Sequence, residues 1–180
     1  VMPAFLSRMS RPFADLSEIM ARFGPARSAA ITSTGCGTDG SLGARLFDSM
    51  DLACSLFGEP ESVNAGYGNP AAHRGLSAGP FAAQAAHGVR RLSGDLACTV
   101  RWSSGRTATV FVSDAAGPLS RKLLVLGQNG TIEADDRVLY WRDTLGMTAE
   151  RVQPARRSLP AAAMSIAAES LATLIADLTA

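Results

Sequence analysis

The chain has 180 residues and nearly balanced charge, with 17 Lys and Arg against 16 Asp and Glu. Apolar residues make up 47% and charged residues 18%, a composition typical of a packed globular domain and not of a disordered chain. The net charge of +1 excludes a bulk electrostatic attraction to nucleic acid or to an anionic membrane surface. The length suffices for one full domain, and we expect residues 1–180 to form a single one.

The three cysteines, Cys36, Cys54 and Cys98, lie far apart, and no Cys/His spacing indicates a zinc site. We therefore expect reduced thiols, a cytoplasmic protein and no metal site. No apolar stretch reaches membrane-spanning length, and no charged leader precedes one. The opening VMPAFLSRMSRPFADL does not look like the start of a fold, so we expect it to be the cut end of a longer polypeptide.

The first predicted elements are a helix and a strand. Apolar residues recur at helical spacing over residues 12–23, and Gly24 followed by Pro25 provides a stop. Residues 26–34 are typical of a strand.

A second helix is predicted from a cap at Ser41 to a stop at Gly58, and residues 61–67 predict another strand. Residues 68–94 are rich in Gly, Ala and Pro, lack clean periodicity and contain both histidines. We expect a long loop there, and loops of this length inside a compact domain are often functional.

Strands dominate the second half of the chain. Residues 96–102 and 107–113 alternate apolar and polar side chains on either side of a turn, which predicts a β-hairpin. The turn at Asn129-Gly130 and the segments around it continue an antiparallel meander to residue 143. The apolar pattern of residues 159–180 predicts a closing C-terminal helix.

Together these elements predict an α+β fold, with a single broad, open, mixed but mainly antiparallel sheet and helices on one face. Apolar residues lie on both faces of the strand at residues 122–127, and Phe111 opposes Val110 and Val112. We therefore expect the other face of the sheet to be available for oligomerisation, as in a homodimer.

Glycines 35, 37 and 40 spell G-x-G-x-x-G between a predicted strand and a predicted helix. In dinucleotide-binding domains such a turn brings the backbone close to a pyrophosphate. Here the strand ends in hydroxyl residues, the next strand has no terminal acidic residue, and no alternating β-α-β pattern continues. An ordinary loop is the favoured interpretation, and a small nucleotide-binding domain stays open as an alternative.

Several stretches within residues 8–142 resemble, in order and spacing, the C-terminal domain of the glucose–fructose oxidoreductase/inositol dehydrogenase (Gfo/Idh/MocA) family. They are RPFADLSEIMARFGPARSAAIT, GSLGARLFDSMDLACSLFGEPESVNAGY, DLACTVRWSSGRTATVFVS and KLLVLGQNGTIEAD. The family's enzymes bind NAD or NADP in an N-terminal Rossmann domain that has a Lys in an E-K-P stretch, and these 180 residues contain neither.

The resemblance implies the substrate-binding and oligomerisation half of an oxidoreductase that acts on a sugar, cyclitol or related polyol. It implies NAD or NADP in the full-length protein, with no cofactor bound by this chain alone. The alternative within the same fold is a binding or scaffold protein without catalysis.

The resemblance also indicates a site on the second helix, which in the family commonly begins G-G-x-x-x-D-x-G-x-H-x-x-D. Counting back from Asp51, the His column falls on Asp48 and the earlier Asp column on Ala44. The usual His is missing, and Asp48 is the candidate to replace it as the base that takes a hydroxyl proton. Asp51 is the second candidate catalytic carboxylate. The structural alternative is that both carboxylates lie on the solvated side of an amphipathic helix.

Two further residues are candidates for binding substrate. Arg45 on the same helix could bind an acidic group, and His73 could close over a substrate from the long loop. A solvated arginine and an exposed loop histidine are the structural alternatives. The sequence contains no nucleophile elbow, P-loop or metal-binding cluster.

Overall fold

The fold is taken from a computed structural model, which describes residues 11–39, 41–68 and 93–152. The predicted C-terminal helix at residues 159–180 and most of the predicted loop at 68–94, His73 and His87 included, lie outside the described residues.

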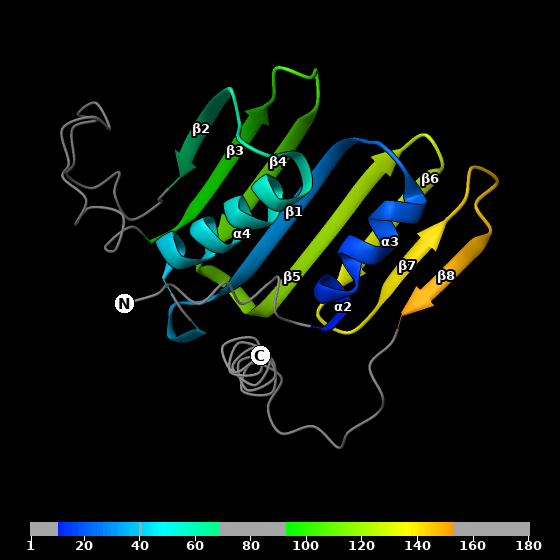
Figure 1. The fold of residues 1–180 in the computed structure, drawn as a ribbon. Helices are drawn as coiled ribbons and strands as arrows, with labels where there is room; N and C mark the ends of the chain where they lie inside the picture. The colour runs from blue at the N-terminus through cyan, green and yellow to red at the C-terminus, as the bar shows by residue number, and fades with distance from the viewer. Residues whose placement is uncertain (1–10, 40, 69–92, 153–180) are drawn as a thin grey trace, which may run out of the picture.

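The described strands form one eight-stranded sheet in the order β2-β3-β4-β1-β5-β6-β7-β8 (Figure 1). Strand β1 pairs parallel with β4 and antiparallel with β5, and every other neighbouring pair is antiparallel. The prediction of a single mixed, mainly antiparallel open sheet is therefore confirmed. The strands are β1 (Ala26–Cys36), β2 (Ser62–Gly68), β3 (Asp95–Arg101), β4 (Thr107–Ser113), β5 (Ala115–Gly127), β6 (Gly130–Asp135), β7 (Leu139–Arg142) and β8 (Thr148–Val152).

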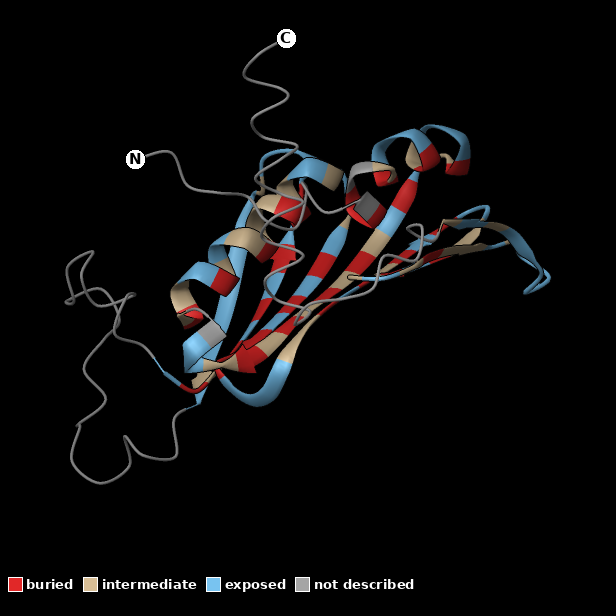
Figure 2. Cartoon of the chain, turned by 90° about the horizontal axis from the view of Figure 1, so that it is seen from below, coloured by how far each residue is buried: buried red, intermediate tan, exposed pale blue. Residues whose placement is uncertain are grey.

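The described helices cover one face of this sheet, as Figures 1 and 2 show. They are α2 (Arg11–Ala14), α3 (Leu16–Phe23), the 3₁₀ turn η1 (Gly37–Asp39) and α4 (Leu42–Phe57). The single helix predicted at residues 12–23 is divided into α2 and α3 at Asp15, which itself keeps helical angles, with φ −70° and ψ −14°. Among the described residues, no helix combines the length and the apolar composition needed to cross a bilayer.

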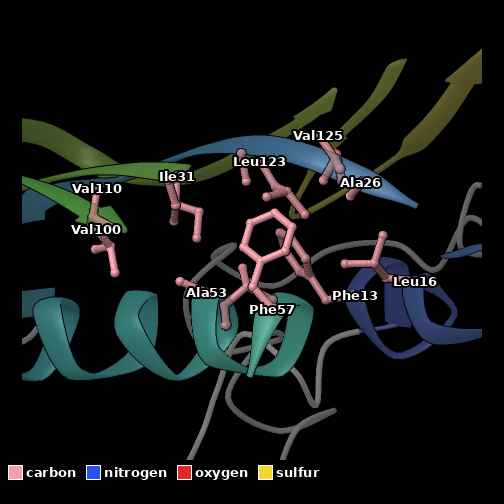
Figure 3. Close-up of a cluster of buried hydrophobic side chains, with 14 of the residues drawn as sticks. Phe13, Leu16, Ala26, Ile31, Ala53, Phe57, Val100, Val110, Leu123 and Val125 are labelled. Carbon is pink, nitrogen blue, oxygen red and sulfur yellow. The ribbon is translucent and has the colours of Figure 1, made fainter. Parts of the chain in front are cut away.

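The apolar core fills the space between the helices and the covered face of the sheet (Figure 3). The predicted alternation holds in β3 and β4, where the buried apolar side chains are Leu96, Cys98, Val100, Ala108, Val110 and Val112. Aromatic side chains close one part of the core, where Phe57 and Trp102 meet edge to face at 4.9 Å between ring centroids. The Trp102 indole N–H donates to the Gly58 carbonyl at 2.9 Å, so a buried polar atom is satisfied.

One strand was not expected from the sequence. Strand β8 has the sequence TAERV and carries no apolar alternation. It forms because the turn at residues 143–147 folds it back against β7: the Asp143 carboxylate accepts from the backbone N–H groups of Leu145 and Met147, each at 2.9 Å. Asx turns of this kind give no hydrophobic signal.

Candidate functional site

Polar side chains are buried together where β1 and β4 end. The strand register places Ser33 of β1 opposite Arg121 of β5, and Thr34 beside Ser113 of β4. Ser33, Ser113 and Arg121 are each no more than 5% exposed, and Ser49 of α4 is 2% exposed. A polar core at one end of an otherwise apolar sheet is costly unless its groups are paired, so it marks this end as a candidate site.

The helix that carries the predicted catalytic residues starts at this end of the sheet. After β1 the chain passes through η1, and the Ser41 hydroxyl accepts a hydrogen bond from the Ala44 backbone N–H at 3.2 Å. This is the N-cap that the sequence predicted. The cap fixes where α4 begins and therefore which side of the helix carries Asp48.

Asp48 belongs to a chain of three charged side chains from three elements. Its carboxylate lies 3.6 Å from the Nη1 atom of Arg121, while the Nε atom of Arg121 donates to Asp136 at 2.6 Å. The backbone N–H of Arg121 also donates to Asp136, at 3.1 Å. The side chains of all three residues are at most 13% exposed, so little water screens their charges. The Arg121 guanidinium lies 5.8 Å from the centre of the Phe13 ring, which covers it on the side of α2.

Asp136, in the turn between β6 and β7, has a perturbed carboxyl group. Burial raises its pKa above the ordinary value, although the charge and hydrogen bonds of Arg121 oppose that rise. The nearby charge of Asp135 adds to the rise. Two carboxylates share one guanidinium here, so the cluster formally carries one negative charge.

Arg45, predicted to bind substrate, is buried beside the end of β1. Its Nη2 atom donates to the Cys36 carbonyl at 2.9 Å, and the residue is 5% exposed. The guanidinium is therefore directed at the backbone of β1, which gives it a structural role. That Arg45 also contacts a substrate stays a prediction.

The glycine motif has a packing explanation at its first position. A Cβ atom built on Gly35 would clash with the Arg45 guanidinium, with Cζ only 2.7 Å away, so Gly35 leaves room for this side chain. A Cβ on Gly37 would meet nothing within 4 Å. Gly35 is therefore explained by the packing of an arginine of the same chain, and the nucleotide-binding alternative stays a prediction.

The remaining candidates are not brought into the cluster in the same way. Asp51 is partly buried one turn after Asp48, and its charge contributes, after burial, to a raised pKa of the Cys54 thiol. The role of His73 stays a prediction, because that residue lies outside the described residues. Within the described ranges, no group of three or more His, Cys, Asp or Glu side chains could hold a metal ion.

Sequence reasoning missed Arg121 and Asp136. A signal for Arg121 was present, because it shares the alternation of Leu123 and Val125 and therefore occupies a core-facing position of β5. A charged residue at such a position needs a buried partner. The sequence had no comparable signal for Asp136, which reads as an ordinary turn residue.

Chemically, the cluster offers a carboxylate, Asp48, held near a positive charge and partly accessible. A carboxylate in such a position can accept a proton from a hydroxyl group, and an adjacent guanidinium can orient it.

Comparison with solved structures shows the fold shared with dehydrogenases of carbohydrates. UDP-N-acetylglucosamine 3-dehydrogenase GnnA from Acidithiobacillus ferrooxidans is 18% identical and matches 95% of this chain with a TM-score of 0.62, over 51% of its own length. Levoglucosan dehydrogenase, solved with NADH and levoglucosan, is 16% identical over 97% of this chain and 56% of its own, with a TM-score of 0.66. An oxidoreductase from Sinorhizobium meliloti is 15% identical over 97% of this chain and 51% of its own, with a TM-score of 0.66.

The chain thus spans about half the length of the dehydrogenases that it matches. No protein-family model matches the sequence, and no curated protein matches it significantly. At these identities the comparison establishes the fold alone.

Proposed function

We propose that this chain is the substrate-binding and oligomerisation half of an NAD(P)-dependent oxidoreductase that acts on a sugar, cyclitol or related polyol. The observation that carries the proposal is the sheet itself. Its helices and eight strands match one half of carbohydrate dehydrogenases over nearly the whole of this chain. The buried charged cluster at the end of β1 provides the reactive group that such a half-enzyme needs.

In this proposal Asp48 accepts the proton of the substrate hydroxyl that becomes a carbonyl. Arg121 keeps the carboxylate in place, and the polar end of the core positions the start of α4. NAD or NADP, bound by a Rossmann domain N-terminal to these residues in the same polypeptide, supplies the hydride acceptor. In this proposal Gly35 makes room for the Arg45 guanidinium and takes no part in binding the cofactor.

The test is turnover by the full-length protein with NAD⁺ or NADP⁺ and a panel of sugars, polyols and UDP-sugars that includes levoglucosan and UDP-N-acetylglucosamine. We expect reduction of the cofactor with at least one member of the panel. The Asp48→Asn variant should lower kcat by about 10² or more, since general base catalysis contributes about this much. The Asp51→Asn variant is the matched control on the same helix.

A folded protein that binds cofactor but turns over no compound of the panel would favour the alternative, a scaffold that kept the fold without the chemistry. An Asp48→Asn variant with unchanged kcat would remove Asp48 from the mechanism.

We also propose that the uncovered face of the sheet binds a second copy of the chain. Phe111 is 40% exposed and Leu126 37% exposed on this face, and the register places small and hydroxyl side chains between them. A shallow hollow of about 400 Å³ opens beside them, with Thr32, Leu124 and Tyr140 in its lining. Exposed apolar side chains on an open sheet face are typical of a surface that a second copy covers.

The oligomer is tested by light scattering after size-exclusion chromatography. We expect a dimer for the wild type and a monomer for Phe111→Glu, which introduces a charge at the centre of the proposed interface. Leu145→Glu is the control, because Leu145 is 85% exposed in the turn between β7 and β8. A wild-type monomer would contradict this part of the proposal.

A further inference from the structure

Arg121 lies between two carboxylates that come from different parts of the fold. Asp48 is on α4, which packs against β1 and β4, and Asp136 is in the turn that joins β6 to β7. Arg121 itself is on β5, between these two halves of the sheet. One guanidinium therefore links the helix that carries the proposed base to the turn between β6 and β7, the strands that follow β5 in the sheet.

The two contacts of Arg121 differ in strength. The Arg121 side chain donates to Asp136 at 2.6 Å, and the Arg121 backbone N–H donates to it at 3.1 Å. Asp136 therefore binds both the backbone and the side chain of the arginine. Toward Asp48 the guanidinium lies at 3.6 Å, an ion pair without a short hydrogen bond. Asp136 thus fixes the arginine, and the arginine approaches Asp48 from a fixed direction.

Burial makes this arrangement sensitive to its geometry. The Arg121 side chain is 6% exposed and the Asp48 side chain 13% exposed, and the Phe13 ring covers the guanidinium. Charges so little exposed interact much more strongly than surface charges. An arginine also has a planar fork whose separate N–H groups can serve two acceptors, which the single ammonium of a lysine cannot do in the same geometry.

We propose that Arg121 is a positioning residue for the reaction, which orients the Asp48 carboxylate toward the substrate hydroxyl, and that Asp136 sets how much of its positive charge acts on Asp48. This inference rests on the proposed function, in which Asp48 is the base. An ionised Asp136 offsets part of the guanidinium charge, and without that carboxylate the guanidinium acts on Asp48 alone.

The groups that face the guanidinium in the described part of the chain are Asp48 from α4, Asp136 from the β6–β7 turn and the Phe13 ring from α2. Asp135 contributes its charge to Asp136. A purely structural alternative exists, in which the same ion pairs only brace α4 against the meander. A structural brace would affect stability without changing the chemistry of the folded enzyme.

The test compares Arg121→Lys and Asp136→Asn with the wild-type full-length enzyme, using NAD⁺ or NADP⁺ and the compound of the sugar panel that gives the highest turnover. Arg121→Lys keeps the charge but not the fork, and Asp136→Asn keeps the shape but not the charge. We expect kcat to fall by about tenfold to a hundredfold in Arg121→Lys, with KM changed by less than about twofold. In Asp136→Asn the acidic limb of the pH profile of kcat should move to lower pH.

The matched control is Arg22→Lys, since Arg22 also pairs with a carboxylate, that of Glu150 at 2.9 Å, but on the surface of α3. It should keep wild-type kcat and KM. Circular dichroism and thermal unfolding show which variants are folded. If Arg121→Lys does not fold, the pH profile of Asp136→Asn decides the question.

Unchanged kcat and an unchanged pH profile in folded variants, with only a lower melting temperature, would overturn the inference and leave Arg121 as a brace. A wild-type enzyme that turns over no compound of the panel would overturn the proposed function first, and this inference with it. The two failures are therefore distinguishable.

Discussion

Replacing Gly35 with alanine should destabilise the fold through the Arg45 side chain. The new methyl group would lie 2.7 Å from the guanidinium carbon and closer still to Nη2, well inside ordinary contact distance. Because Arg45 is 5% exposed, its guanidinium has little room to move without leaving the Cys36 carbonyl, which it now contacts at 2.9 Å. Loss of one hydrogen bond to a charged donor corresponds to about 1.5–3 kcal/mol.

The assay is urea unfolding of Gly35→Ala followed by fluorescence or circular dichroism, and the expected decrease in the free energy of unfolding is about 1.5–3 kcal/mol. Gly37→Ala is the matched control two residues later, where a Cβ would meet nothing within 4 Å, and it should change stability by less than about 0.5 kcal/mol. In the double variant with Arg45→Ala, the clash disappears, so the combined loss should be smaller than the sum by about 1 kcal/mol or more.

Equal stability of Gly35→Ala and Gly37→Ala would refute the reasoning. So would additive effects of Gly35→Ala and Arg45→Ala. Either result would mean that the arginine does not require a glycine at position 35, and the packing explanation of this glycine would be wrong.

Three further predictions concern stability. Burial raises the pKa of Asp136 in the folded state. The contribution of this carboxyl group to the free energy of unfolding is therefore fully present below the ordinary pKa of 3.8 and is lost as the pH rises through the folded pKa. Unfolding free energies measured from pH 3 upward should therefore fall relative to those of Asp136→Asn over this window, and a constant difference would contradict the raised pKa. Ser41→Ala should lower stability by about 1 kcal/mol because the N-cap of α4 is lost, whereas Ser55→Ala on the same helix should change it little, as urea unfolding can show. Gly127→Ala should lower the melting temperature and decrease the free energy of unfolding by about 1–3 kcal/mol, because its methyl group would lie 2.6 Å from Cζ of the fully buried Phe23 ring. An unchanged melting temperature would show that this part of the core is loosely packed.

Several elements could be predicted from the sequence because their signals are local. The buried positions of β3 and β4 follow from alternation within seven residues, and the cap at Ser41 and the stop at Gly58 follow from single residues at the ends of a helical pattern. The fold class follows from the order of these elements. Where the local signal was weak, as in β8, the prediction failed, because that strand is held by a turn and an edge pairing and not by an apolar pattern.

The candidate site could be predicted only in part. The helix was predicted from its cap at Ser41 and its stop at Gly58, and Asp48 was singled out from the spacing of a family resemblance. The partners of Asp48 could not be found in this way. Arg121 is 73 positions farther along the chain and Asp136 is 88, and nothing in either local sequence shows that the three side chains meet.

By itself, then, the sequence determined the kinds of element, their order and the apolar faces that form the core, since each depends on a periodicity that a few neighbouring residues express. The tertiary structure decided that β1 lies in the middle of the sheet, parallel to a strand about 80 residues later, with the Ser33 side chain turned into the core. It also decided that Gly35 makes room for Arg45 and that Arg121 joins two carboxylates. These are contacts between segments distant in sequence, and their energy depends on burial and direction, which exist only once the chain has folded.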